Sequence, residues 1–163
     1  MAWLFGIAIE CGTDSNSAQR IAEHFEGFEV ELSNNSKGTF SIATEKEEVP
    51  DSTKSIWWIH IYSNEFRSGV DTPEIDLLLS ELGWALYKHL KAAPYFRFAL
   101  VGLEVTMAFS FKDFPSLLNN PSNVSEYQGL VLSNQQVLGT KSENLFTSFT
   151  EEHQWIPYAG NNL

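Results

Sequence analysis

The segment Ser55-Ile-Trp-Trp-Ile-His-Ile-Tyr-Ser63 gives the strongest strand signal in the sequence. Successive side chains of a strand point to opposite faces. One face of this segment is apolar and carries Trp57, Ile59 and Ile61. The other face is largely apolar and carries Ile56, Trp58, His60 and Tyr62. Because a strand that is apolar on both faces is usually buried on both, we expect residues 55–63 to form a central strand covered by a layer on each side.

The N-terminal segment also alternates, but between large and small side chains. Its large face carries Trp3, Phe5, Ile7, Ile9 and Cys11. Its other face carries Ala2, Leu4, Gly6, Ala8 and Glu10. Small side chains allow a helix or another backbone to approach closely. The pattern therefore predicts a first strand over residues 2–11 with a close neighbour on its small face.

Two helices are predicted from apolar residues at helical spacing. The first follows a loop rich in capping residues at 12–17 and ends at Gly27. The second begins at Thr72, which supplies an N-cap before a proline and an acidic residue. Its apolar stripe continues to Ala93, and Pro94 ends it. Each helix follows a predicted strand, so the strand-then-helix unit occurs twice.

Further strands are predicted at residues 28–32, 40–42, 96–101 and 129–133, with a polar loop at 45–54 and a helical turn at 145–149. The element order β-α-β-β-β-α-β predicts an α+β fold: a two-layer sandwich with a mainly antiparallel sheet, ferredoxin-like with extra strands, and two principal helices on one face.

We expect one domain over residues 1–163, in which residues 112–163 form an irregular extension that contains some strand. The sheet face without helices needs a cover. The extension, a homodimer partner or another protein could supply it, and the apolar residues of the extension favour the first.

Composition and charge exclude several classes of protein. The 163 residues are 43% hydrophobic, which is too apolar for a disordered chain. Twenty-one acidic against 10 basic side chains give a net charge of -11. This argues against binding to nucleic acids, which requires clustered cations, and against docking on anionic membranes. Residues 1–82 hold 15 of the acidic and 5 of the basic side chains, so the negative charge is concentrated there.

The apolar run at the N-terminus ends at Glu10 and has no basic residue before it. It is too short to span a membrane, which takes ~20 apolar residues, and it does not have the pattern of a secretory signal. The expectation is a cytoplasmic protein, most simply a bacterial one. A single cysteine excludes an internal disulfide and a cysteine-built zinc site.

Cys11 is the best candidate nucleophile. It is predicted to lie where the first strand ends and a capped helix begins, and a helix N-terminus can lower the pKa of a thiol. A phosphatase-type loop would need an arginine six residues later, where Ser17 stands. The alternative is that Cys11, on the same face as the large apolar residues, is a small buried hydrophobic side chain. The sequence favours this alternative.

His60 is the second candidate, as a general base assisted by a carboxylate. Glu10 could come within reach if the first strand lies beside the strand that carries His60. The alternative is a buried histidine whose ring nitrogens are satisfied by the backbone or by a tyrosine hydroxyl. The four histidines are too dispersed to suggest a metal site, and no motif for a cofactor occurs, so neither is predicted.

The second helix carries a possible partner-binding patch opposite its apolar stripe, formed by Leu77, Trp84 and Lys88. Leu77 and Trp84 are two turns apart on the same side. An exposed tryptophan beside a leucine is a plausible anchor for a partner. The alternative is that the C-terminal segment folds over this helix. Under the first reading, a Trp84→Ala variant would fold normally and lose partner binding.

Two functions from different classes are compatible with these features of the sequence. The first is a small acidic domain that binds another, basic protein, in the manner of an inhibitor or an immunity-type partner. Glu29 and Glu31, on the polar face of a predicted strand, would belong to its contact surface. The second is a small enzyme or ligand-binding domain with a pocket near Glu10, Cys11 and His60. The chain has no local catalytic motif, which favours the first function.

Overall fold

The computed structural model describes residues 4–66, 72–105 and 114–160. At its centre are β1 (Phe5–Glu10), α1 (Ser15–Phe25), β3 (Lys37–Glu48), β4 (Ser55–Ser63), α2 (Pro73–Leu90) and β5 (Phe98–Leu103). The four strands stand in the order β3-β4-β1-β5, and every neighbouring pair is antiparallel. This is the ferredoxin-like arrangement of two strand-helix-strand crossovers around a hairpin. The α+β sandwich predicted from the sequence is confirmed.

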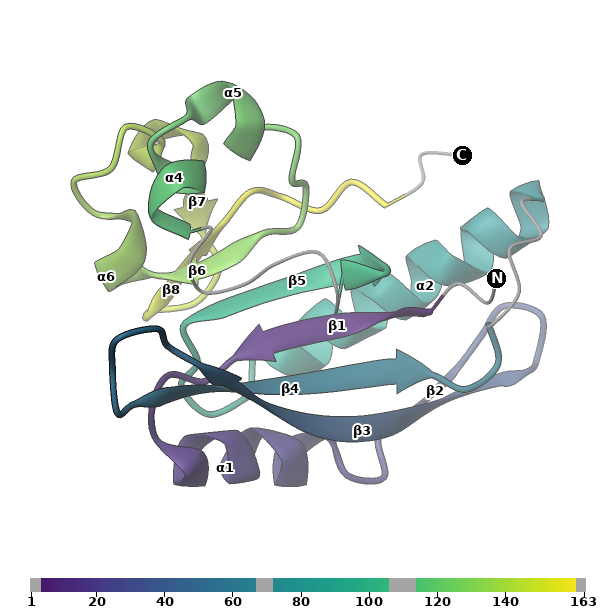
Figure 1. Cartoon of the computed structure of the whole chain (residues 1–163). Helices are drawn as coiled ribbons and strands as arrows, with labels where there is room; N and C mark the ends of the chain where they lie inside the picture. The colour runs from purple at the N-terminus through teal and green to yellow at the C-terminus, as the bar shows by residue number, and fades with distance from the viewer. Residues whose placement is uncertain (1–3, 67–71, 106–113, 161–163) are drawn as a thin grey trace.

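Shorter strands extend this sheet on both sides, giving eight in the order β2-β3-β4-β1-β5-β6-β8-β7 (Figure 1). The added strands are β2 (Glu29–Glu31), β6 (Val131–Ser133), β7 (Thr147–Ser148) and β8 (His153–Trp155). The short helices are α4 (Phe114–Leu118), α5 (Pro121–Val124), α6 (Asn134–Val137) and the 3-10 turn η2 (Glu143–Leu145). The sequence predicted neither β8 as a strand nor the pairing of β7 with it.

The central position predicted for residues 55–63 is confirmed, because β4 pairs with β3 on one side and β1 on the other. Ile59 lies opposite Ile9 of β1 and opposite Thr44 of β3. The two faces of β4 point into two separate hydrophobic clusters. Both faces of the sheet are therefore packed over β4, as the apolar character of its two faces requires.

The first hydrophobic cluster lies between the sheet and the two principal helices. The sheet contributes Ile7, Ile9, Ile59, Ile61, Ala99 and Val101. The helices contribute Ala18, Ile21 and Phe25 from α1 and Leu78, Leu82, Leu86 and Leu90 from α2. Both helices thus cover the same face, as the sequence predicted.

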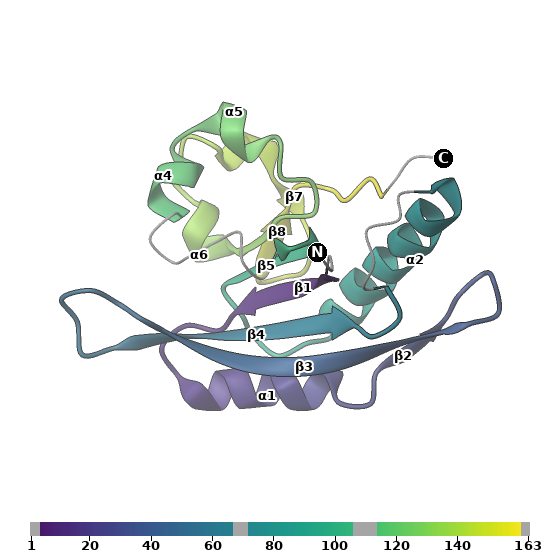
Figure 2. The ribbon, with the colours of Figure 1, turned by 45° about the vertical axis from the view of Figure 1, so that its right-hand side comes forward.

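The second hydrophobic cluster lies on the opposite face and consists mainly of C-terminal residues. Leu117, Val124, Leu130, Val137 and Phe146 pack there against Trp58, Phe98 and Leu100 of the sheet. Figure 2 shows α1 beneath the sheet and α4, α5 and α6 above it. The extension therefore covers the second face over β1, β4 and β5.

Local sequence explains where the principal helices begin. Asp14 caps α1 by accepting a hydrogen bond from the backbone N–H of Asn16 (3.0 Å). Thr72 caps α2, and Pro73 occupies its first turn. Both caps use residues that satisfy the otherwise unpaired N–H groups of a helix start.

Two local predictions are wrong. The polar loop predicted at 45–54 starts later, because β3 continues to Glu48 and pairs with β4 throughout. Pairing with β4 satisfies the backbone hydrogen bonds of β3 whatever its side chains are. A run of charged residues therefore remains compatible with an edge strand. The helical turn predicted at 145–149 is also wrong, since η2 ends at Leu145 and β7 follows.

The C-terminal segment is held against α2 by tyrosines. The buried Tyr87 hydroxyl donates to the Gly129 carbonyl (2.7 Å) and accepts from the Val101 N–H (3.1 Å). The Tyr158 ring lies over Gly83, where an added Cβ would stand 2.5 Å from its hydroxyl oxygen. These contacts hold Gly129 and Tyr158 against α2. Within the described residues, no helix is both long and apolar enough to cross a membrane.

Candidate functional site

Cys11 follows β1, and its side chain packs in the cluster under the helices. It is 5% exposed, and its Sγ lies 3.8 Å from the Ile9 carbonyl oxygen. Burial raises the pKa of the Cys11 thiol to about 12, and the neighbouring Glu10 carboxyl contributes to this rise. The thiol is protonated at neutral pH, so the geometry favours the buried-hydrophobe alternative over a nucleophile.

Glu10 precedes Cys11 and points to the opposite face, into the second layer. It is fully buried, and its Oε1 accepts a hydrogen bond from the Gly12 N–H (2.5 Å). Its Oε2 lies 3.5 Å from the Nε of Arg97 and has no hydrogen-bond partner. Burial raises the pKa of Glu10, and the Arg97 guanidinium and the Gly12 N–H lower it in part.

His60 lies on the same face as Glu10, one strand away. The residue of β1 that stands opposite His60 is Ala8, whereas Glu10 of β1 stands opposite Trp58. The Nε2 of His60 lies 2.9 Å from the Oε2 of Glu45 on the other neighbouring strand, β3. Burial lowers the pKa of His60, even though the Glu45 carboxylate opposes that shift. Glu10 and His60 are thus close in the sheet, but Glu45 is the carboxylate that binds the imidazole.

A polar group therefore crosses three strands, formed by the buried Glu10, Trp58 and His60, the half-buried Glu47 and the exposed Glu45. Trp58 donates from Nε1 to the Oε2 of Glu47 (2.9 Å), and its ring stacks beside His60 with centroids 6.1 Å apart. Two atoms of this group are buried without hydrogen-bond partners, Glu10 Oε2 and His60 Nδ1. An imidazole oriented by a carboxylate can act as a base through its other nitrogen.

The three candidate residues of the predicted pocket do not converge. Glu10 and His60 face the second layer, whereas Cys11 faces the helices. The sequence missed Glu45 and Arg97, which supply the charged partners of His60 and Glu10. Both are distant in sequence from the groups that they contact, so no local spacing could have revealed them. The described residues contain no cluster of histidine, cysteine and acidic side chains that could hold a metal ion.

The patch predicted on α2 is exposed and also partly covered. Leu77 is 38% exposed, Trp84 is 46% exposed, and Lys88 is exposed. The Trp84 ring nevertheless contacts Trp155 and Tyr158 edge-on, with centroids 6.4 and 5.3 Å away. The C-terminal segment thus packs against the ring that was proposed as a partner anchor.

A Trp84→Ala variant is consequently expected to lose about 1–2 kcal/mol of unfolding free energy, less than a fully buried aromatic ring would lose. The loss reflects the contacts with Trp155 and Tyr158. Urea unfolding measures it, with Leu77→Ala as the control for an exposed side chain of α2 without these ring contacts. An unchanged unfolding midpoint for Trp84→Ala would show that the ring is free of the C-terminal segment.

An acidic strip runs along β2 and β3 on the face opposite the helices. Glu29 and Glu31 are exposed and stand opposite Thr39 and Lys37. Residues directly opposite each other share a face of the sheet, and alternate residues of one strand share it too. Glu45 and Glu47 of β3 therefore lie on the same face as Glu29 and Glu31. We define the acidic strip as these four glutamates.

Three of the four glutamates of the acidic strip are exposed, and Glu47 is half-buried. The Glu45 side chain is 64% exposed and that of Glu29 is 53% exposed. Between them, Ser41 and Ala43 are exposed as well. One cation lies close by, since Lys37 pairs with Glu29 at 2.6 Å. The extension covers β1, β4 and β5 but leaves this part of the second face uncovered.

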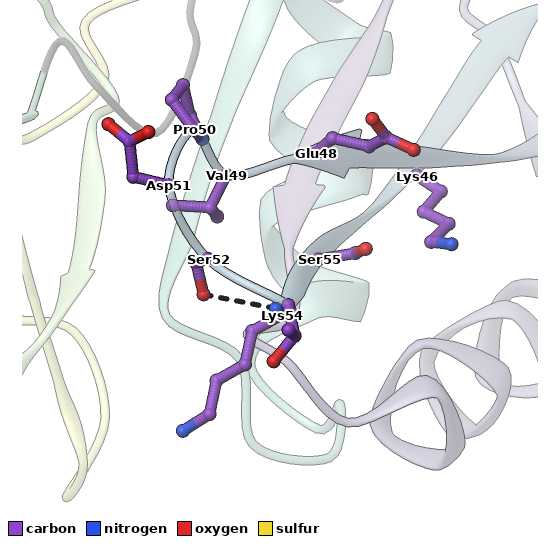
Figure 3. A pocket seen from close by; sticks show the side chains of 9 residues that line it. Lys46, Glu48, Val49, Pro50, Asp51, Ser52, Lys54 and Ser55 are labelled. Carbon is purple, nitrogen blue, oxygen red and sulfur yellow. Dashed lines mark hydrogen bonds between the residues drawn. The ribbon is translucent and has the colours of Figure 1, made fainter.

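Two hollows in the described part of the chain lie apart from Glu10 and His60. One lies at the turn between β3 and β4, lined by Lys46, Glu48, Val49, Pro50, Asp51, Ser52, Thr53, Lys54 and Ser55. Its side chains point in different directions and do not converge on one point (Figure 3). Another lies between the end of α2 and residues 150–153. Neither hollow contains Glu10 or His60.

Comparisons of the chain with protein-family models, with curated proteins and with solved structures gave no match.

Proposed function

We propose that the protein binds a basic protein partner through the acidic strip. The observation that carries this proposal is the set of four glutamates on one face of β2 and β3, of which Glu29, Glu31 and Glu45 are exposed and Glu47 is half-buried. Carboxylates gathered on an open surface attract a cationic partner and speed its association at low salt. An inhibitor or immunity-type role is the specific form of this function that the charge favours.

A cationic probe tests the proposal without knowledge of the natural partner. Binding of fluorescent decalysine is measured at about 0.01 M and about 1 M salt, where the screening length is about 30 Å and about 3 Å. We expect binding at low salt that disappears at high salt. The triple variant Glu29→Gln/Glu31→Gln/Glu45→Gln should lose about tenfold in affinity at low salt, since an exposed ion pair contributes about 0.2–1 kcal/mol.

A matched control separates the position of the charges from their number. Glu126, Glu151 and Glu152 are exposed on the C-terminal third of the chain. Changing these three to glutamine alters the net charge by the same amount and should leave decalysine binding nearly unchanged. Equal losses for the two triple variants would mean that net charge alone attracts the probe, which contradicts a dedicated surface.

A small enzyme or ligand-binding domain is the second candidate function. It is supported by Glu10 Oε2 and His60 Nδ1, two buried atoms without a hydrogen-bond partner, because buried polar atoms usually have one and each exception needs an explanation, such as a catalytic role. Cys11 takes no part in this second candidate function, because its side chain faces the helices. A ligand that binds there should raise the melting temperature of the wild type and not that of His60→Gln.

A further inference from the structure

Along most of its length, the outer edge of β3 is paired with no other strand in the part of the chain that the structure describes. β2 pairs with β3 only at residues 37–39, whereas β4 pairs with the other side of β3 from Phe40 to Glu48. Among the described residues, none forms a strand against the outer edge of residues 42–48. Figure 2 shows β3 as a long strand along one border of the sheet, with the β2 hairpin at one end and the turn to β4 at the other.

Hydrogen-bond alternation identifies which groups face this open edge. The Asn64 N–H donates to the Thr39 carbonyl (3.0 Å), so the backbone of Thr39 faces β4. Alternate residues of an antiparallel strand bond to the same neighbour. The odd-numbered residues of β3 therefore bond to β4. The N–H and C=O groups of Ile42, Thr44 and Lys46 point outward.

The two faces beside this edge differ in chemistry. Glu45 and Glu47 lie on the face of the acidic strip. Ile42, Thr44 and Lys46 lie on the helix side, where Ile42 is half-buried and packs against the first hydrophobic cluster, while Thr44 and Lys46 are exposed. A strand added here would have alternate side chains beside the glutamates and beside Ile42. The edge thus matches a strand in which basic and apolar residues alternate.

We propose that the partner binds by adding an antiparallel strand of alternating basic and apolar residues to the outer edge of β3. This deepens the proposed function and rests on it. Main-chain hydrogen bonds to Ile42, Thr44 and Lys46 supply affinity, and the basic side chains beside Glu45 and Glu47 supply specificity. A second copy of this chain is disfavoured, because pairing two such edges would gather the glutamates of both copies on one face of the joined sheet.

Two synthetic peptides of about eight residues, a common strand length, test the mode of binding. One alternates lysine and valine, and the other has the same composition in two blocks. Only the alternating peptide can place all its lysines on the acidic face. We expect it to bind at least about fivefold more tightly by fluorescence anisotropy, since only this peptide combines the main-chain hydrogen bonds with all its basic contacts. Equal affinities would overturn strand addition.

A proline variant removes the edge donor and leaves every charge in place. Thr44→Pro deletes one outward N–H, and proline is tolerated on edge strands whose N–H faces solvent. We expect at least about fivefold weaker binding of the alternating peptide, with Thr44→Val as the control that keeps the N–H. Unchanged binding to Thr44→Pro would overturn the proposal.

Methylated peptides test the same contact on the wild-type protein, so the result does not depend on how Thr44→Pro folds. In the antiparallel arrangement the valine N–H groups face β3 and the lysine N–H groups face away. Methylation of the valine nitrogens should abolish binding, whereas methylation of the lysine nitrogens should leave most of it.

The outcomes separate the two proposals. If decalysine and the alternating peptide both fail to bind at low salt, the proposed function fails. If both bind but alternation, Thr44→Pro and valine methylation have no effect, the acidic surface stands and strand addition fails.

Discussion

A Gly6→Ala variant is expected to lose about 3 kcal/mol or more of unfolding free energy, the largest effect of any substitution considered for this chain. A Cβ added at Gly6 would collide with the backbone carbonyl oxygen of Ile61 on the neighbouring strand. Backbone cannot swing aside as the end of a side chain can, so β1 and β4 would have to separate. Because β4 is the centre of the sheet, both hydrophobic clusters would be disturbed.

Urea unfolding of Gly6→Ala measures this loss, and Gly27→Ala is the matched control. Gly27 has a φ of 70°, and an added Cβ there would meet no atom within 4 Å. Its substitution should cost only the backbone strain, roughly 1–2 kcal/mol. If Gly6→Ala lost no more unfolding free energy than Gly27→Ala, β1 and β4 would not approach each other as closely as the structure shows.

An Arg97→Met variant is expected to lose about 3 kcal/mol at neutral pH, because it leaves the buried Glu10 carboxylate without its cation. Arg97 Nε lies 3.5 Å from Glu10 Oε2, and the Glu10 side chain is fully buried. Methionine retains much of the aliphatic volume of arginine, so the variant removes mainly the charge.

The loss in Arg97→Met should also depend on pH. Burial already raises the pKa of Glu10 above its ordinary value of 4.5, and loss of Arg97 removes a group that lowers it. Because the pKa of Glu10 is higher in the folded state than in the unfolded state, the folded protein binds the Glu10 proton more tightly. The free energy of unfolding therefore falls as the pH rises from the unfolded-state pKa through the folded-state pKa. The deficit relative to wild type should be smaller at about pH 5 than at about pH 8.

The double variant Glu10→Gln/Arg97→Met controls for the contribution of Glu10. It removes the carboxylate that titrates, so it should recover part of the stability and lose the extra pH dependence. Urea unfolding of the three proteins at both pH values gives the comparison. A deficit in Arg97→Met that is equal at the two pH values would show that Arg97 acts by packing and not by its charge.

The sequence predicted the parts of the fold that have strong local patterns. β4 was identified from two apolar faces, and α2 from its Thr72-Pro73 start and apolar stripe. These signals depend on each residue and its near neighbours, so they need no knowledge of the rest of the chain. The length of β3 was missed because its residues 45–48 are charged, and their strand conformation comes from pairing with β4.

The candidate site was less predictable because its contacts are long-range. The sequence selected Glu10 and His60 and made their contact conditional on adjacent strands, but it could not show that Glu45 reaches His60 from β3. It placed Cys11 near a helix start, where the pKa of a thiol falls, while burial raises that pKa instead. Whether the helix start or burial decides the pKa of a thiol depends on what packs around the side chain.

Hydrogen exchange of the backbone amides in wild-type protein, with and without the alternating lysine-valine peptide, shows where the peptide binds. We expect the peptide to slow exchange of the outward-facing amides of Ile42, Thr44 and Lys46, and high salt to reverse the effect. Slowing at Leu77 and Trp84 of α2, with no change along β3, would contradict this expectation and place the binding surface on the helix.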